Sequence, residues 1–238
     1  MHNAPSTPPD ITENLKQIQK NVTQLCLKYH RKPENVQLLA VSKTKPAESI
    51  CTAFNAGQIR FGENYLQEAL SKIETLKALP IEWHFIGAIQ SSKTRKLAQH
   101  FSWIHSVARV KIARRLSTQR PAGLAPLNIC LQVNISEEAS KSGFKTSEIE
   151  SAVDDIITLP NICLRGLMTI PASTSELNEQ RAIFAQLQAI QKTLQKKYAQ
   201  IDTLSMGMSS DMEAAIAQGS TLVRIGTAIF GARAPARV

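Results

Sequence analysis

Short apolar runs alternate with amphipathic stretches along most of the chain. The apolar runs occupy residues 36–41, 59–62, 83–86, 103–107, 127–135, 163–170, 203–208 and 222–230. Several are rich in Val and Ile and do not alternate with polar residues, which is typical of strands buried on both faces. Because helical patterns separate these runs, the sequence predicts strands paired in a parallel sheet.

The first helical pattern covers residues 11–29, where apolar residues recur at spacings of four and three. The others occupy residues 47–56, 65–76, 92–100, 110–119, 147–157, 176–198 and 211–218. Eight strand–helix units within 238 residues favour a single closed (β/α)8 TIM barrel over an open, doubly wound sheet. We expect no helix after the last strand, and we expect the extra N-terminal helix to take that place in the outer ring.

The predicted barrel covers residues 11–233 and forms the only domain. Residues 1–10, rich in Pro, predict a flexible tail, and residues 234–238 a short C-terminal tail. No apolar run approaches the roughly 20 residues of a membrane span, and the N-terminus lacks the pattern of a secretory signal. We therefore expect a cytoplasmic protein with no membrane contact.

The four cysteines are scattered, with no CxxC pair and no nearby His at ligand spacing. The sequence therefore predicts free thiols, with neither a disulfide framework nor a metal site. The net charge is +9, and a basic surface attracts phosphates and other anions. Because no basic block or interleaved aromatic platform is present, we expect no nucleic-acid binding. Binding of nucleic acid or an acidic partner remains an alternative that only the charge motivates.

Active sites of barrels lie at the C-terminal ends of the strands. The first predicted strand delivers Lys43 directly after Ser42. Burial at a barrel mouth lowers the pKa of an amine, and a neutral amine can form a Schiff base with an aldehyde. The alternative is a solvated lysine in the turn Lys43–Pro46.

The seventh predicted strand ends in a segment that could bind a phosphate. Ser210 and Glu213 have the spacing of a capping box, which predicts the start of a helix. A helix N-terminus binds anions; Gly207 gives room for a close approach, and Ser209 adds a hydroxyl. The alternative is an ordinary helix cap.

The eighth predicted strand carries Arg224 among apolar residues, followed by Gly226 and Thr227. An unpaired charge in such a strand is costly, so Arg224 must meet an anion or a hydrogen-bond acceptor inside the barrel. The loops after strands seven and eight form the usual phosphate site of this fold. Both segments together therefore predict a phosphate-bearing ligand.

Three further polar residues lie at or near strand ends. Asn64 offers an amide to a ligand or caps a helix, and His84 alternates with apolar residues, as a satisfied core histidine does. Lys141 follows the fifth strand, either as a solvated loop residue or near the mouth.

These segments together resemble the pyridoxal phosphate homeostasis protein family, also called the YggS/PROSC family, over nearly the whole chain. The resemblance is carried by Leu39–Pro46, Phe61–Tyr65, Trp83–Gly87 with Gln90 and Ser91, Asn134 with Ser140–Gly143, Arg165–Met168, Ser205–Ser209 with Asp211 and Met212, and Val223–Thr227. It implies a barrel similar to that of alanine racemase, with pyridoxal 5′-phosphate (PLP) as the cofactor.

The resemblance also implies the roles of the site residues. Lys43 would hold PLP as a Schiff base, while Ser209, Gly226 and Thr227 would bind its phosphate. Asn64 and Met206 would complete the site. By similarity to alanine racemase, Arg224 would face the pyridine nitrogen, although it could instead reach the phosphate. A cation beside that nitrogen disfavours its protonation and makes PLP a poorer electron sink.

We therefore predict a PLP carrier or buffer that could deliver the cofactor to PLP-dependent apo-enzymes, with no catalytic residue of its own. The chain lacks room for the additional β domain of alanine racemase, and a racemase needs an acid/base on both faces of the α-carbon. Tyr29, Tyr65 and Tyr198 all fall on predicted helices. The alternative is a small PLP-dependent amino-acid racemase. A monomer is expected, and a second PLP site at Lys45 or Lys141 stays open.

Overall fold

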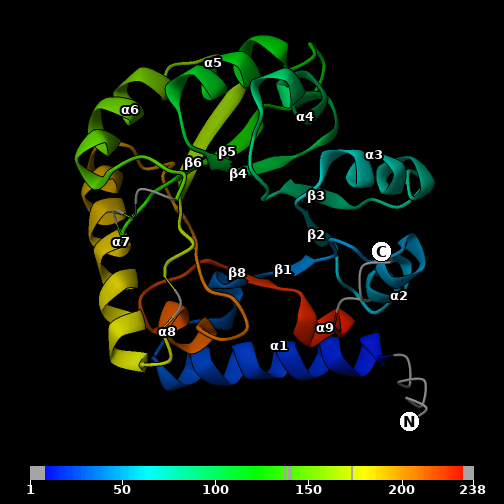
Figure 1. Cartoon of the computed structure of the whole chain (residues 1–238). Coiled ribbons are helices and arrows are strands. Elements are labelled where there is room, and N and C mark those ends of the chain that lie inside the picture. Colours follow the sequence, from blue (N-terminus) through cyan, green and yellow to red (C-terminus); the bar gives the residue numbers. More distant parts are fainter. Residues whose placement is uncertain (1–8, 137, 139–140, 173, 233–238) are drawn as a thin grey trace.

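The strands of the barrel follow one another in sequence order around a closed, parallel sheet (Figure 1). This computed structural model describes residues 9–136, 138, 141–172 and 174–232. Its strands are β1 (Gln37–Val41), β2 (Arg60–Glu63), β3 (Glu82–Phe85), β4 (Trp103–Val107), β5 (Leu127–Gln132), β6 (Ile162–Met168), β7 (Thr203–Ser205) and β8 (Leu222–Ile225). The closed (β/α)8 barrel predicted from the sequence is confirmed.

Helices surround the strands as an outer ring (Figure 1). They are α1 (Ile11–Lys28), α2 (Ala47–Asn55), α3 (Leu66–Thr75), α4 (Thr94–His100), α5 (Val110–Gln119), α6 (Ile149–Ile156), α7 (Leu177–Lys197), α8 (Met212–Ala217) and α9 (Thr227–Phe230). Short 3₁₀ turns at Pro33–Asn35, Ser91–Lys93 and Thr146–Glu148 lead into β1, α4 and α6.

The N-terminal helix fills the gap in this ring between α8 and α2. Asp10 caps α1 by accepting a hydrogen bond from the Glu13 amide at 3.0 Å, and Ile11, Leu15, Ile18 and Val22 are buried. The helix packs against α2, α8 and α9. The prediction that α1 occupies this place in the ring is therefore confirmed.

The end of the chain differs from the prediction of one strand at residues 222–230. The strand ends at Ile225, and the four-residue helix α9 follows, so the expectation that no helix follows β8 was wrong. Ile229 and Phe230 are buried, and the side-chain Nδ2 of Asn14 donates to the Ile229 carbonyl at 3.0 Å. The apolar run continues past the strand because it packs on α1, and hydrophobicity alone does not distinguish the two states.

Most buried apolar side chains form one continuous core that includes residues of both the strands and the surrounding helices. Trp103, Cys130 and Met168 form a separate cluster. All four cysteines are free. Within the described residues, no helix is long and apolar enough to cross a membrane.

Some predictions fall on residues that the structure does not describe. These are most of the tail predicted at residues 1–10, together with Ser140, Arg233 and the tail at residues 234–238.

Candidate functional site

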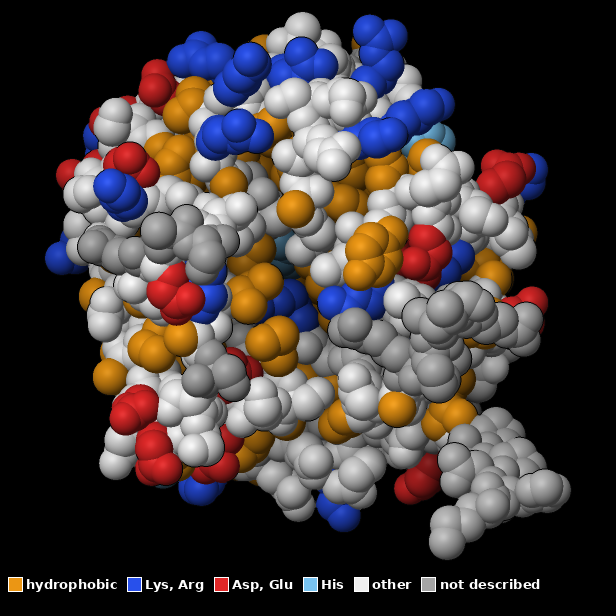
Figure 2. Space-filling view, in the orientation of Figure 1, with side chains coloured by type: hydrophobic (Ala, Val, Ile, Leu, Met, Phe, Trp, Pro, Cys, Tyr) orange, Lys and Arg blue, Asp and Glu red, His pale blue; other side chains and the backbone are white. Residues whose placement is uncertain are grey.

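The predicted cofactor residues come from the ends of neighbouring strands. Lys43 follows β1, Asn64 follows β2, Met206 and Ser209 follow β7, Arg224 lies in β8, and Gly226 and Thr227 follow β8. The strand order β7-β8-β1-β2 makes these ends adjacent. Figure 2 shows the molecule hollowed near the middle of this view, with Lys or Arg and hydrophobic side chains at the edge.

Backbone contacts fix the spacing of these strand ends. The Ser42 amide donates to the Gly62 carbonyl at 3.0 Å, and the Arg224 amide donates to the Gly207 carbonyl at 2.9 Å. A Cβ on Gly226 would lie 3.2 Å from the Val41 carbonyl oxygen. Glycine at this position therefore lets the β8 end approach the β1 end, just before Lys43.

The turn that carries Lys43 is held on both sides by a cluster of charged residues, of which Glu63 and Lys72 are buried. Ser42 Oγ donates to Glu63 Oε1 at 2.7 Å, and Lys72 Nζ donates to the Ser42 carbonyl at 2.8 Å. On the other side, the Thr44 amide donates to Glu68 Oε1 at 2.6 Å. Thr44 has a φ of 63°, a left-handed conformation that is unfavourable for a β-branched residue. These contacts hold that conformation.

Glu63, Glu68 and Lys72, with Ser42 and Thr44, make up what we call the Lys72 network. Lys72 Nζ contacts Glu63 Oε1 at 2.8 Å and Glu68 Oε1 at 2.5 Å. Glu63 is fully buried, and burial raises the pKa of its carboxyl despite the contact with Lys72. The sequence analysis missed Lys72, because a lysine on an amphipathic helix normally faces solvent.

Asn64 lies beside a cavity of about 270 Å³ that Gly87, Asn134 and Lys141 also line. The buried Oδ1 atoms of Asn64 and Asn134 have no hydrogen-bond partner. A buried polar atom without a partner is unfavourable, so each can accept a donor from a ligand. A Cβ on Gly87 would lie 2.0 Å from the Asn64 carbonyl oxygen, so glycine is required there. The N-cap of α3 is Tyr65 and not Asn64.

The loop between β7 and α8 differs from the predicted capping box. The helix begins at Met212 with Asp211 as its N-cap, and Asp211 Oδ1 accepts a hydrogen bond from the Met208 amide at 2.5 Å. The prediction of a cap by Ser210 was therefore wrong, because the carboxylate turns back into the loop. Ser209 is exposed at the tip of this loop, whereas Met206 is buried.

Gly207 makes the sharp return of this loop possible. Its φ is 99°, and a Cβ there would lie 2.5 Å from the Ala215 side chain. A side chain at this position would therefore be strained and would push the loop away from α8.

Arg224 is 4% exposed and finds its acceptors inside the barrel, as the sequence predicted. Its Nη1 donates to the Ser205 carbonyl at 2.6 Å and to Ser205 Oγ at 2.9 Å, and its Nη2 donates to the Thr169 carbonyl at 2.9 Å. Burial lowers the pKa of this guanidinium to about 10, so it stays charged at neutral pH. The acceptors come from strand ends and fix the plane of the guanidinium.

His84 is a fully buried core residue, as predicted, and it belongs to a larger polar group. Its Nε2 lies 2.8 Å from Glu82 Oε1, and its Nδ1 lies 2.8 Å from His105 Nε2. His105 Nδ1 lies 2.7 Å from Ser205 Oγ. The sequence analysis missed His105, which is hidden in the apolar run of β4; only its position two residues after Trp103, on the same strand face, could have indicated it.

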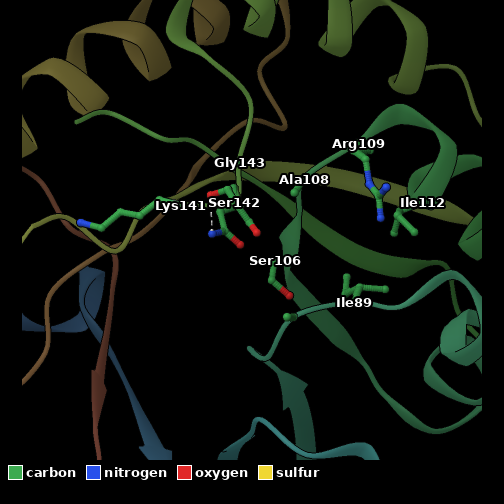
Figure 3. A pocket seen from close by; sticks show the side chains of 10 residues that line it. Ile89, Ser106, Ala108, Arg109, Ile112, Lys141, Ser142 and Gly143 are labelled. Atoms are coloured by element: carbon green, nitrogen blue, oxygen red, sulfur yellow. Dashed lines mark hydrogen bonds between the residues drawn. The ribbon is translucent and has the colours of Figure 1, made fainter. Parts of the chain in front are cut away.

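The two other lysines considered for a second site have partners. Lys45 Nζ donates to the Ala232 carbonyl at 2.7 Å, and Lys141 Nζ lies 2.9 Å from Glu138 Oε1. Lys141 also lines a cavity of about 450 Å³ with Ser106 and Arg109. Figure 3 shows its amine pointing away from both of these residues.

The fold and the adjacent strand ends agree with the family model that matches the chain. Residues 14–234 match the family described as "Alanine racemase, N-terminal domain". The barrel of alanine racemase from Corynebacterium glutamicum is similar in fold, with a TM-score of 0.70 at 14% identity, covering 93% of this chain and 62% of that one. At this identity the likeness shows the fold alone.

Curated relatives define the family more narrowly. The Pyridoxal phosphate homeostasis protein of Pseudomonas aeruginosa is 55% identical over 223 residues, which cover 94% of this chain and 96% of that protein. The protein of the same name from Escherichia coli K12 is 51% identical over 227 residues, with coverage of 94% and 97%. The chain belongs to the pyridoxal phosphate homeostasis protein family.

The chain is also similar to a solved structure of PipY from Synechococcus elongatus, which is described with PLP bound. It is 37% identical to this chain, with a TM-score of 0.81, and covers 93% of this chain and 100% of its own. The structure of PipY without PLP has a TM-score of 0.83 at 38% identity. It also covers 93% of this chain and 100% of its own.

Proposed function

We propose that this protein binds PLP at the carboxyl end of the barrel, with Lys43 as the Schiff-base lysine, and that it carries or buffers PLP in the cell. The observation that carries the proposal is the convergence of Lys43, Ser209, Gly226 and Thr227 on adjacent strand ends. Relatives at 51–55% identity are named for PLP homeostasis, and PipY is described with PLP bound.

The residues at this end fit the chemistry of PLP. Thr227 begins α9, whose first amides have no partner within the helix, and its side chain is exposed. Together with Gly226 and the Ser209 hydroxyl, it would hold the phosphate. The orphaned Oδ1 of Asn64 would accept a donor from the ring region, and buried Met206 would border it. When bound, PLP supplies an aldehyde for the lysine and an electron-withdrawing ring.

Arg224 would hold the ring of the cofactor and set its electronic properties. We propose that this guanidinium faces the pyridine nitrogen, where a permanent cation disfavours protonation of the ring. An unprotonated ring withdraws electrons poorly, so a carbanion beside it would gain little stabilisation.

Two of the three tyrosines support a carrier over a racemase, because their hydroxyls are bound far from the strand ends. A racemase needs a second acid/base opposite the lysine. The Tyr29 hydroxyl contacts Glu213 Oε1 at 2.8 Å, and the Tyr198 hydroxyl contacts Asp154 Oδ1 at 2.7 Å. Both are thereby engaged in the outer ring of helices. Tyr65 is 52% exposed at the start of α3. We therefore propose that the protein has no catalytic residue of its own.

The distribution of charge supports delivery of PLP to an acidic recipient enzyme. Residues 83–136 contain eight Lys and Arg and no Asp or Glu, although the whole chain has a net charge of only +9. Lys93, Arg95, Lys96 and Lys111 are exposed on or beside α4 and α5. Figure 2 shows basic side chains gathered over these two helices. A surface of one sign steers partners of the opposite sign.

Charge reversal tests this surface. The triple variant K93E/K96E/K111E should slow PLP transfer to an acidic apo-enzyme at least about tenfold at low salt, an effect that screening reduces at high salt. The matched variant K16E/K20E/K192E reverses exposed lysines of α1 and α7 and should leave the transfer rate unchanged. Equal slowing by both variants would remove the α4–α5 surface from the proposal.

Borohydride reduction after addition of PLP tests the cofactor site itself. Reduction fixes a Schiff base as a stable adduct, which peptide mass spectrometry then locates. We expect the dominant adduct on Lys43, its loss in Lys43→Ala, and its retention in the neighbouring control Lys45→Ala. Adducts scattered over surface lysines would refute the site. An assay for D-amino acids formed from L-amino acids completes the test, and turnover that depends on Lys43 would refute the carrier role.

A further inference from the structure

A continuous chain of hydrogen bonds crosses the barrel beneath the candidate site. It runs from Glu82 on β3 through His84, His105 on β4 and Ser205 on β7 to Arg224 on β8. Each contact along it is between 2.7 and 2.9 Å. Because β4 and β7 are not neighbours in the sheet, the contact between His105 and Ser205 passes through the barrel interior. We call these five residues the histidine relay.

The two ends of the relay are charged, and its middle is fully buried. The side chain of Glu82 is 35% exposed, and its hydrogen bond to His84 lowers the pKa of its carboxyl. Burial lowers the pKa of His84 and that of His105, so both imidazoles are neutral at neutral pH. A neutral imidazole has one donor and one acceptor nitrogen.

The charged ends fix the direction of every hydrogen bond between them. An ionised carboxylate only accepts, so His84 must carry its proton on Nε2 and present Nδ1 as an acceptor. His105 must then donate from Nε2 and accept at Nδ1. The Ser205 hydroxyl donates to that Nδ1, which leaves its oxygen lone pairs to accept from Arg224. If both imidazoles are neutral and Glu82 accepts, only this assignment places a proton between the two histidines. Any other assignment leaves two acceptor nitrogens facing each other or removes the donor to Glu82.

Other groups around the relay are compatible with this assignment. Arg60 Nε contacts Glu82 Oε1 at 3.1 Å and helps to keep the carboxylate ionised. Trp103 stacks on His84 with centroids 5.5 Å apart and rings 4° from parallel. Near the other end, Asp211 and Cys130 interact electrostatically with Arg224, and burial raises the pKa of the Cys130 thiol to about 12. That thiol is therefore neutral at neutral pH.

We propose that Glu82, His84, His105 and Ser205 are positioning residues that hold Arg224 in one orientation toward the bound cofactor. This inference rests on the proposed function, because it assigns Arg224 to the PLP ring. The relay fixes one acceptor of the guanidinium, the Ser205 hydroxyl, while backbone carbonyls supply the others. The members of the relay that lie next to Arg224 add no further charge. Arg224 thus remains the only cation of the relay.

Nitrogen-15 NMR of the histidine rings tests the relay in the protein without PLP. We expect both His84 and His105 to be neutral at pH 7 with the proton on Nε2. A hydrogen bond to a carboxylate biases the tautomers of His84 by more than about tenfold. In Glu82→Leu, this bias should fall to near unity, whereas Glu82→Gln should retain it because its amide oxygen still accepts. A proton on Nδ1 of either ring in the wild type, or a doubly protonated ring, would overturn the relay.

The second measurement follows the cofactor. In Glu82→Leu, the dissociation constant for PLP should rise at least about threefold, the size of one weak hydrogen bond. The pH midpoint of the visible absorption band of bound PLP should also shift. Glu82→Gln should restore both, and the exposed control Glu74→Leu should match the wild type. An unchanged Kd and midpoint in Glu82→Leu would refute the positioning role.

The two proposals fail in different ways. If borohydride traps no PLP on Lys43 of the wild type, the proposed function fails, and with it the action of Arg224 on the cofactor. The tautomers measured without PLP still decide whether the relay is present. If Lys43 is trapped normally in Glu82→Leu and the pH midpoint does not move, the proposed function stands and the positioning role fails.

Discussion

Two buried polar groups flank the candidate site, and they are built on different principles. The Lys72 network places opposite charges, Lys72 and Glu63, in contact behind the Lys43 turn. The histidine relay places two neutral imidazoles between a half-exposed carboxylate and the guanidinium of Arg224. The first holds a strained backbone, with Thr44 at a φ of 63°. The second holds a side chain and places only neutral groups between its two charged ends.

The difference predicts which change should destabilise each group. A buried ion pair depends on both partners, because removal of one leaves a charge in a medium that solvates it poorly. A neutral relay loses only hydrogen bonds when one member is removed, but it depends on the pH at which its imidazoles stay neutral. The Lys72 network should therefore be sensitive to substitution, and the histidine relay to acid.

The largest expected effect is on the Lys72 network. Lys72→Met leaves Glu63 buried without its cation, and this should reduce the free energy of unfolding by about 3–5 kcal/mol in urea titrations. Glu63→Gln/Lys72→Met removes both charges together and should recover at least about half of that loss. A cost below about 1 kcal/mol for Lys72→Met would show that the pair is not energetically coupled.

Acid should next distinguish the two groups. The pKa values of His84 and His105 are lowered in the folded state by burial, while in the unfolded chain they return to about 6.5. The unfolded state then binds more protons below that pH, so stability falls with a slope of up to about 1.4 kcal/mol per pH unit for each histidine. Urea titrations at pH 5.5 should therefore give a lower free energy of unfolding than at pH 7, by up to about 2–3 kcal/mol.

The exposed His30 provides the control for this measurement. His30→Asn, which suits the φ of 54° at that position, keeps His84 and His105 and should retain the loss of stability in acid. A wild-type stability that is flat over this pH range would mean that the two buried histidines are already protonated in the folded protein.

A smaller effect is expected where the relay meets Arg224. Ser205→Ala removes one acceptor of the guanidinium and the donor to His105, but the carbonyls of Ser205 and Thr169 still accept from Arg224. Loss of these two hydrogen bonds should cost about 1–2 kcal/mol in unfolding experiments. The exposed Ser210→Ala serves as the control. A loss as large as that of Lys72→Met would contradict the distinction between the two groups.

The smallest effect should come from a Lys–Glu ion pair that is exposed to solvent, in contrast to the buried pair of the Lys72 network. Lys77 contacts Glu74 at 2.6 Å, yet both side chains are more than 70% exposed. Lys77→Met should leave the free energy of unfolding unchanged within the error of the measurement, because solvent screens this pair. A comparable loss for Lys77→Met and Lys72→Met would mean that burial is not the source of the difference.

The sequence predicted much of the site because each strand end can be identified locally. Lys43, Asn64, Gly226 and Thr227 follow short apolar runs, and the barrel rule brings the ends of such runs to one face. The assignment of PLP to these residues came from the resemblance to a family and remains a proposal. The supporting residues Lys72 and His105 were missed, because their partners lie on other elements and no local pattern marks them.

By itself, the sequence determined the closed barrel, the place of the N-terminal helix and the need for acceptors around Arg224, because burial and periodicity act within each segment. Only the tertiary structure decided that residues 227–230 form a helix, that Asp211 and not Ser210 occupies the N-cap position of α8, and that Lys72 is buried. It also decided that His105 meets Ser205 across the barrel. These outcomes depend on contacts between distant segments, and such contacts exist only once strand register and helix packing are set.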